Sequence, residues 1–188
     1  MGSEERVEDI RKLWNNESVI DFYRIEELGN RIIESWNSGG KLAFGGNGGS
    51  AAEASHLAAE FVGKCVINHD PWPAICLNES ISALTAISND FGFDQVLLRQ
   101  SKALLRRGDV IIGLSTSGAS RNVLDALTEA TDRGIYSILW TSERFSKLAQ
   151  YSINEIWIAP TLSTPRAQEV HLTWGHLLSE YVESTFEK

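Results

Sequence analysis

The chain has 188 residues, of which 43% are hydrophobic and 22% charged. This composition and length fit one ordinary globular domain. The formal net charge of -8 argues against a nucleic-acid-binding surface or an attraction to anionic membranes. No apolar run approaches the roughly 20 residues of a membrane span, and the acidic start of the chain lacks the apolar segment of a signal peptide. Since Cys65 and Cys76 form no C-x-x-C motif, we expect reduced thiols in a cytoplasmic protein.

Two helices are expected before the first strand, at residues 4–15 and 18–37. In the second, apolar residues recur at helical spacing, namely Ile25, Leu28, Ile32, Ile33 and Trp36. These helices have no strand of their own to cover. We therefore expect residues 1–38 to form an N-terminal helical extension of a single domain, 1–188, which packs on that domain or on another subunit.

The rest of the chain alternates between short apolar segments and helical patterns. The expected strands are residues 41–44, 73–77, 110–114, 136–140 and 153–158. The expected helices are residues 51–63, 80–87, 94–106, 121–133, 145–149 and 164–187, with a turn at 89–92. This alternation predicts an α/β domain with a mainly parallel sheet of about five strands. Ligands of such sheets bind at the carboxyl ends of the strands.

A glycine-rich loop follows the first expected strand, with the sequence Phe44-Gly-Gly-Asn-Gly-Gly-Ser50. Glycines allow backbone N–H groups to approach a ligand closely, and a helix N-terminus favours anions. The loop also matches G-x-G-x-x-A formally, but a dinucleotide site needs an acidic residue at the end of the second strand. Asp70 precedes that strand and Glu79 lies too far along the chain. We therefore expect a phosphate site and no nucleotide cofactor.

A second polar loop, residues 115–120, follows the third expected strand and precedes a helix. Its hydroxyl groups and exposed N–H groups can bind a phosphate without a counter-cation. These hydroxyls belong to Ser115, Thr116, Ser117 and Ser120. The alternative is a helix N-cap with solvent-exposed hydroxyls, which is less favoured in a chain that already has a glycine loop.

Histidine and carboxylate side chains on two helices suggest a metal site. His56 and Glu60 are four residues apart and share one helix face, although they could be only a polar face. The final helix carries Gln168, Glu169, His171 and His176. Such groups suit zinc or another borderline ion. Gln168 and His176 are separated by about 12 Å of rise and about 80° around a straight helix, so one reaches far or serves a neighbouring subunit. His171 is as plausible as a structural histidine, and His69 is assigned no role.

Taken together, these motifs resemble the phosphoheptose isomerase branch of the SIS (sugar isomerase) domain family. The resemblance spans nearly the whole chain after the N-terminal helices. Besides the two polar loops, it rests on His56-x-x-x-Glu60, Leu84-Thr-Ala-Ile-Ser-Asn-Asp-Phe-Gly-Phe93, Gly108-Asp-Val110, Arg166-x-Gln-Glu-x-His171 and His176.

The resemblance implies a three-layer, flavodoxin-like sandwich with a five-stranded parallel sheet, and a homotetramer whose sites use more than one subunit. It implies interconversion of sedoheptulose 7-phosphate and D-glycero-D-manno-heptose 7-phosphate, towards nucleotide-activated heptoses. The implied zinc ligands are His56, Glu60, Gln168 and His176. The implied substrate contacts are Asn47, Gly48, Gly49, Ser50, Glu60, Asn89, Asp90, Ser115, Thr116, Ser117, Ser120 and Gln168.

The chemistry of an aldose–ketose isomerase agrees with these residues. Moving a carbonyl between neighbouring carbons through an enediol needs a base, an acid and a group that stabilises the oxyanion. We assign Glu60 as the base, His176 as the acid, and zinc as the polarising ion. Because a zinc-bound carboxylate is a weaker base, Glu60 either binds the ion loosely or alternates between roles.

The sequence departs from the family pattern at three places, and none removes a residue needed for isomerisation. Ala119 replaces a common Asn, residues 140–144 replace a glycine-containing loop, and Thr164-Pro165 replaces an acidic position. The alternatives are a non-enzymatic tetramer that binds the replication initiator, a sugar-phosphate sensor, and an isomerase of another ketose phosphate. His176 and the complete Gly48-Gly49-Ser50 favour the enzyme.

Overall fold

One parallel sheet forms the centre of the computed structural model, which describes residues 2–145 and 150–186. The strand order is β2-β1-β3-β4-β5, and every neighbouring pair is parallel. The strands are β1 (Leu42–Gly46), β2 (Ala74–Cys76), β3 (Val110–Leu114), β4 (Tyr136–Ser142) and β5 (Glu155–Ala159). The predicted five-stranded parallel sheet is therefore confirmed, and its order changes direction at β1 and β3, where such sheets bind ligands.

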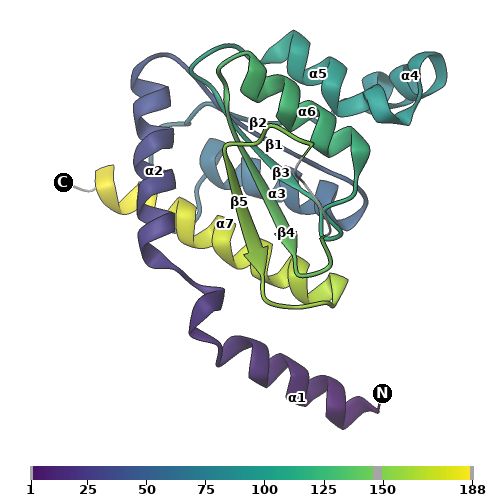
Figure 1. Ribbon diagram of the computed structural model, residues 1–188. Coiled ribbons are helices and arrows are strands. Elements are labelled where there is room, and N and C mark those ends of the chain that lie inside the picture. The colour runs from purple at the N-terminus through teal and green to yellow at the C-terminus, as the bar shows by residue number, and fades with distance from the viewer. Residues whose placement is uncertain (1, 146–149, 187–188) are drawn as a thin grey trace.

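Helices cover both faces of the sheet and make three layers (Figure 1). One face is covered by α2 (Phe22–Asn37), α3 (Gly49–Val62) and α7 (Thr164–Phe186). The other is covered by α5 (Val96–Leu104) and α6 (Arg121–Asp132), and α4 (Ile81–Phe91) packs outside α5 on this side. The predicted three-layer fold is thus confirmed.

The strands are buried on both faces because their side chains alternate between two cores. In β1, Leu42 and Phe44 join the core beneath α3 and α7, whereas Ala43 joins the core beneath α5 and α6. All five residues of β3 are buried. Continuous apolar segments of this kind are typical of parallel strands covered by helices on both sides.

Element boundaries differ from the predictions where polar side chains decide the local structure. The second helix begins at Phe22 rather than residue 18, because residues Glu17–Val19 form the 3-10 turn η1 and Asp21 caps α2. The segment predicted as a turn, 89–92, is helical through Phe91 and ends at Gly92 with φ +89°. The helix predicted at 94–106 is divided into η2 (Phe93–Gln95) and α5. The helix predicted at 145–149 lies, apart from Phe145, outside the described residues.

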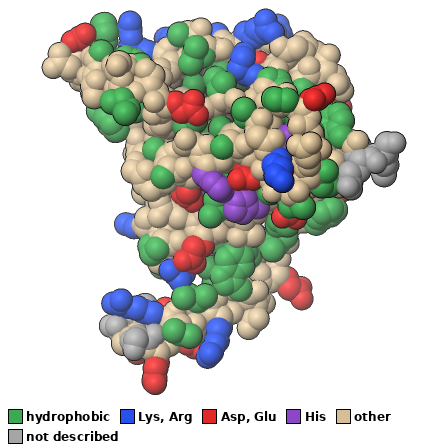
Figure 2. Space-filling model, turned by 180° about the vertical axis from the view of Figure 1, so that it is seen from behind, with side chains coloured by type: hydrophobic (Ala, Val, Ile, Leu, Met, Phe, Trp, Pro, Cys, Tyr) green, Lys and Arg blue, Asp and Glu red, His purple; other side chains and the backbone are tan. Residues whose placement is uncertain are grey.

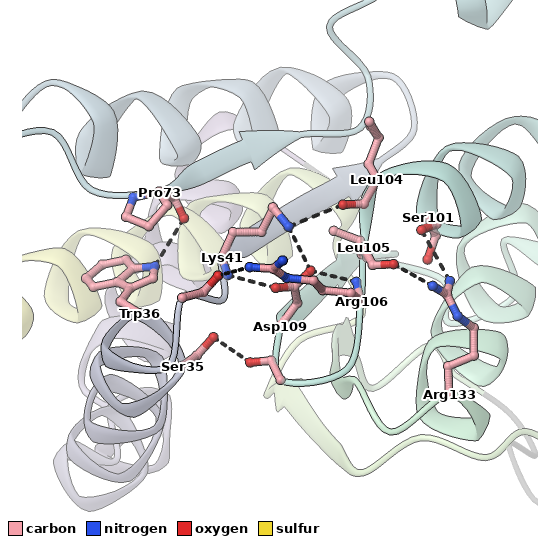
Figure 3. Close-up of polar contacts among 12 residues, drawn as sticks. Ser35, Trp36, Lys41, Pro73, Ser101, Leu104, Leu105, Arg106, Asp109 and Arg133 are labelled. Atoms are coloured by element: carbon pink, nitrogen blue, oxygen red, sulfur yellow. Dashed lines mark hydrogen bonds and ion pairs between the residues drawn. The ribbon is translucent and has the colours of Figure 1, made fainter.

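Polar contacts at the amino edge of the sheet tie the starts of β1 and β3 together (Figure 3). Asp109 is buried directly before β3, and its carboxylate accepts hydrogen bonds from the main-chain N–H of Lys41 at 2.9 Å and of Arg106 at 2.8 Å. The Lys41 ammonium pairs with the same carboxylate at 3.0 Å. These contacts align the starts of the two strands, and the parallel register, which pairs Leu42 with Val110 and Gly46 with Leu114, brings their carboxyl ends to the same level.

The N-terminal helix α1 (Ser3–Trp14) extends away from the three-layer body (Figure 1). Its side chains Val7 and Trp14 are exposed. Among the described residues, no helix combines the length and apolar character that crossing a membrane requires.

Candidate functional site

The glycine loop joins β1 to α3 at the carboxyl edge of the sheet. Gly48 has φ +55° and directly precedes α3, a conformation that favours glycine. A Cβ atom at Gly46 would lie 2.7 Å from the main-chain oxygen of Ser50. The loop therefore needs glycine at both positions in order to place the N-terminus of α3 beside the end of β1. An N-terminus in this position favours a bound anion.

The second polar loop follows β3, the strand next to β1, so the two loops lie at the same edge. Ser115 is buried and its hydroxyl bonds to the hydroxyl of Ser120 at 2.9 Å. The Ser117 hydroxyl accepts from the N–H of Ala119 at 3.2 Å, and Ser142 donates to the carbonyl of Thr116 at 2.6 Å. Ser120 is the N-cap residue of α6, but its side chain makes no capping bond. The hydroxyl-rich loop therefore ends at the N-terminus of α6, which is the second helix N-terminus that the sequence predicted beside a polar loop.

Helices α3 and α7 bring His56, Glu60 and His176 together. One ligand atom from each residue lies within 4.8 Å of the others. The Nε2 atoms of His56 and His176 are 2.9 Å apart, and His56 Nε2 is 3.4 Å from Glu60 Oε1. The His56 side chain is 48% exposed, and Figure 2 shows histidine side chains at the surface beside acidic ones. The predicted pairing of groups from two helices is therefore present.

Close packing holds α3 against α7. A Cβ atom at Gly175 would overlap the buried side chain of Leu57. Near the end of α7, the buried Glu183 carboxylate accepts main-chain N–H bonds of 2.8 to 3.0 Å from Cys65, Val66 and Ile67. These residues follow α3 after Gly63 and Lys64. The two helices are therefore fixed at the level of the histidines and again beyond them.

Glu60 has a second neighbour that the sequence did not indicate. Burial and the Glu60 carboxylate raise the pKa of the Cys65 thiol to about 12. The thiol therefore stays protonated at neutral pH, so it is a poor nucleophile. Cys65 and Cys76 are both free cysteines.

Gln168 occupies a different level of α7 from His176. Its side-chain amide lies against Gly49, where a Cβ atom would overlap it. Gln168 thus faces the N-terminus of α3, whereas His176 faces His56, about two turns further along. The prediction that a straight helix separates these two side chains agrees with this placement. Glycine at position 49 leaves the space that the Gln168 amide occupies.

His171 is a structural residue, which was one of the two predicted possibilities. It is fully buried, and its Nε2 lies 3.0 Å from the carbonyl of Thr141, to which it donates. Burial lowers the pKa of its imidazole to about 4, so the ring is neutral. His69, to which no role was assigned, stacks on Trp72 with 3.5 Å between ring centroids.

Asn89 and Asp90 lie on α4, in the layer on the far side of the sheet from α3 and α7. Both are exposed, and the Asn89 amide bonds to the Asp90 carboxylate at 2.7 Å. Helix α4 packs on η2 and α5 and has no buried residue. Within one chain, these two residues do not join the cluster of His56, Glu60 and His176.

Two residues near the site were missed because their burial cannot be inferred from local sequence. Glu53 precedes His56 by one turn on the same face of α3, and burial raises the pKa of its carboxyl to about 7. Asn122 is 2% exposed at the start of α6 and exchanges two side-chain amide bonds of 2.8 Å with Asn47. Glu53 follows the helical period of His56 and Glu60, which was the only available signal for it.

Comparison with known proteins gives the same family at sequence and structure level. The SIS domain family model matches residues 7–142. A phosphoheptose isomerase of Thermodesulfovibrio yellowstonii is 46% identical over 159 residues, covering 85% of this chain and 79% of the relative. One from Aquifex aeolicus is 39% identical over 184 residues, covering 94% and 96%.

Solved structures agree with the sequence relatives. A phosphoheptose isomerase from Francisella tularensis has a TM-score of 0.88 and 25% identity, covering 98% of this chain and 100% of that chain. One from Neisseria gonorrhoeae has a TM-score of 0.86 and 33% identity, covering 97% and 100%. The resemblance seen in the sequence motifs is thus confirmed by relatives matched over most of their length. The chain belongs to the phosphoheptose isomerases of the SIS domain family.

Proposed function

We propose that this protein is an aldose–ketose isomerase that converts sedoheptulose 7-phosphate to D-glycero-D-manno-heptose 7-phosphate. The observation that carries the proposal is the convergence of Glu60 with His56 and His176, on helices that also border the glycine loop. A carboxylate and an imidazole in contact are the groups that a proton transfer between neighbouring carbons needs. The reaction would supply the biosynthesis of nucleotide-activated heptoses.

In this proposal, Glu60 takes the proton from one carbon and His176 delivers a proton to the neighbouring oxygen or carbon. The substrate phosphate lies between the two polar loops at the helix N-termini, which favour an anion. Anchoring the remote phosphate positions the reacting carbons. The proposed substrate contacts are Asn47, Gly48, Gly49, Ser50, Glu60, Asn89, Asp90, Ser115, Thr116, Ser117, Ser120 and Gln168.

The donor set also fits a divalent metal ion. The Nε2 atoms of His56 and His176 are 2.9 Å apart, and with a Glu60 carboxylate oxygen they lie within 4.8 Å of one another. Such N and O donors suit zinc. His56, Glu60 and His176 would hold the ion. Gln168, the fourth proposed ligand, lies beside Gly49, so it would either extend along α7 to this ion or serve the site of another copy. A bound zinc ion would polarise the substrate carbonyl and stabilise its developing negative charge.

We further propose that the protein works as a homotetramer in the cytoplasm, with residues 1–38 contributing to assembly. Large apolar side chains are exposed on the first helices and around α4, among them Phe22, Tyr23, Ile81, Phe91 and Phe93. Burying them between copies removes apolar surface from water. It would also let Asn89 and Asp90 reach a site on another copy. Two free thiols suit a reducing compartment.

Replacing Glu60 by Gln tests the proposed base. The variant keeps the shape of the side chain but cannot accept the proton, so we expect turnover to fall by about 10²-fold or more while sugar-phosphate binding persists. Glu169→Gln is the matched control, because Glu169 pairs with Arg166 on α7 and not with the cluster. Unchanged turnover in Glu60→Gln would remove Glu60 from the mechanism.

Light scattering tests the proposed assembly. A tetramer has four times the chain mass of 20.8 kDa, and it should dissociate when Phe91→Asp and Phe93→Asp are combined. A wild-type protein that stays monomeric at micromolar concentration would contradict the proposal that Asn89 and Asp90 serve another copy.

A further inference from the structure

Three asparagine side chains hold the glycine loop from two sides. We call Asn47, Asn78 and Asn122 the amide brace. Asn78 accepts from the N–H of Gly46 at 3.1 Å and donates to its carbonyl at 3.0 Å. On the other side, Asn47 and Asn122 exchange two amide bonds of 2.8 Å each.

The sheet topology explains why the brace reaches both sides. Strand β1 lies between β2 and β3, Asn78 follows β2, and Asn122 lies on α6 after β3. The loop that leaves the middle strand is therefore tied to the segments leaving both neighbours. The pair of Asn47 and Asn122 is the direct side-chain link between the glycine loop and the helix that begins after Ser120.

The separation of the two loops matters for a phosphate. One phosphate bound at both N-termini must receive its hydrogen bonds from two independent segments, and their spacing decides whether all of them can form. Groups held in place before binding lose less conformational entropy when the ligand arrives. Two amides that exchange two hydrogen bonds resist movement, because separating them leaves the donor and acceptor of the buried Asn122 without their partners.

The geometry points to Asn122 as a positioning residue for phosphate binding, acting through Asn47. The inference rests on the proposed function, since the phosphate belongs to the sugar substrate. It also assigns the Asn47 side chain to holding the loop, so that Asn47 contacts the ligand through its main chain. An amide pair suits this role because it links the loops without placing a negative charge beside the phosphate.

The chemistry of the pair makes asparagine specific at position 122. Each amide gives one donor and one acceptor to the other. A carboxylate at either position has no donor, so one of the two bonds is lost and a negative charge is added. Asn122→Asp therefore keeps the volume of the side chain, which favours a folded variant, while breaking the pair and repelling an anion.

A double-mutant cycle tests the inference. Asn47→Ala, Asn122→Ala and the double variant are titrated with inorganic phosphate, followed by ³¹P NMR, and with sedoheptulose 7-phosphate, followed by calorimetry. Asn154→Ala is the matched control. The Asn154 side chain likewise links two segments of the chain, accepting from the N–H of Ser137 at 2.9 Å, but at the amino edge of the sheet.

Each single variant should raise the dissociation constants of both ligands about tenfold, the factor that one hydrogen bond of typical strength supplies. The double variant should bind both ligands as tightly as the single variant with the larger loss, because either substitution already breaks the pair. Asn122→Asp should weaken both ligands at least as much as Asn122→Ala, and Asn154→Ala should change neither dissociation constant.

Losses that multiply in the double variant would contradict the inference, since they would show two independent contacts. Asn122 variants with a lower Tm but with the same dissociation constants as Asn154→Ala would also contradict it. So would a wild-type protein that binds neither ligand. A wild-type protein that binds both ligands but does not isomerise the sugar would refute the proposed function and leave the inference intact.

Discussion

Glu53 gives a sharp test of the electrostatics beside the cluster. Both of its carboxylate oxygens are buried, and within the described part of the chain neither has a hydrogen-bond partner. Burial raises the pKa of this carboxyl from 4.5 to about 7, and the nearby Ser50 hydroxyl partly opposes the rise. An ionised carboxylate without a partner is costly in such a place. Glu53→Gln keeps the shape of the side chain and removes the ionisation.

The sign of the effect follows from proton linkage. A carboxyl whose pKa is higher in the folded state binds its proton more tightly there than in the unfolded state. The protonated form therefore stabilises the fold fully below the unfolded pKa of 4.5, and this contribution is lost as pH rises towards about 7. The pKa difference between the unfolded and the folded state corresponds to at most about 3.4 kcal/mol in the free energy of unfolding. Since the carboxyl is only partly buried, we expect about 1–2 kcal/mol.

Thermal and denaturant unfolding at pH 4.5 and pH 8 measure this contribution. Glu53→Gln should match the wild type at pH 4.5 and exceed it at pH 8 by about 1–2 kcal/mol. For a domain of this size, that corresponds to roughly 2–8 °C in Tm. Protein concentration is kept constant, because assembly also changes Tm. Glu34→Gln removes one charge at an exposed site and is the control.

Two outcomes would refute this reasoning about Glu53. One is a Glu53→Gln variant that is no more stable than the wild type at pH 8. The other is a gain that is equally large at pH 4.5, because it would come from packing and not from ionisation. A gain of the same size in Glu34→Gln would point to net charge instead.

Three further variants test the packing that supports the site. Asp109→Ala should destabilise the fold by about 3 kcal/mol, because it leaves Lys41 and two N–H groups without their buried partner; an unchanged denaturation midpoint would contradict the role of the amino edge. Gly175→Ala should lower the free energy of unfolding by about 1–3 kcal/mol and weaken zinc retention, and adding Leu57→Ala should restore the space that the new Cβ atom needs. Full zinc retention in the single Gly175→Ala variant would contradict the close approach of α3 and α7. Gly49→Ala should displace the Gln168 amide and slow turnover with little loss of stability, and wild-type turnover would show that Gln168 does not need that position.

The strands and both polar loops could be predicted because their signals are local. A continuous apolar segment such as Val110–Leu114 is readable in the sequence, and so is the glycine loop that follows β1. The order β2-β1-β3-β4-β5 follows from the family resemblance rather than from any single segment. The turn at 89–92 was predicted because Asn and Asp favour turns. It was wrong, because Asn89 and Asp90 lie in the last turn of α4 and the helix ends at Gly92.

The remaining features depend on contacts between distant parts of the chain. Asn122 is paired with a residue 75 positions away, and Glu183 bonds a segment more than 110 positions away. Neither partner can be found from spacing. The cluster itself was predicted because His56 and Glu60 share a helix face, whereas the position of Gln168 opposite Gly49 depends on how α7 lies on α3.

The most direct test of the account is the conversion of sedoheptulose 7-phosphate by the purified protein, followed by NMR. The protein is stripped of metal by a chelator and assayed with and without added zinc, with Glu60→Gln in parallel. We predict aldoheptose 7-phosphate only when zinc is added, and almost none from Glu60→Gln. Failure of the folded, zinc-supplied protein to form any aldoheptose 7-phosphate would contradict the central claim.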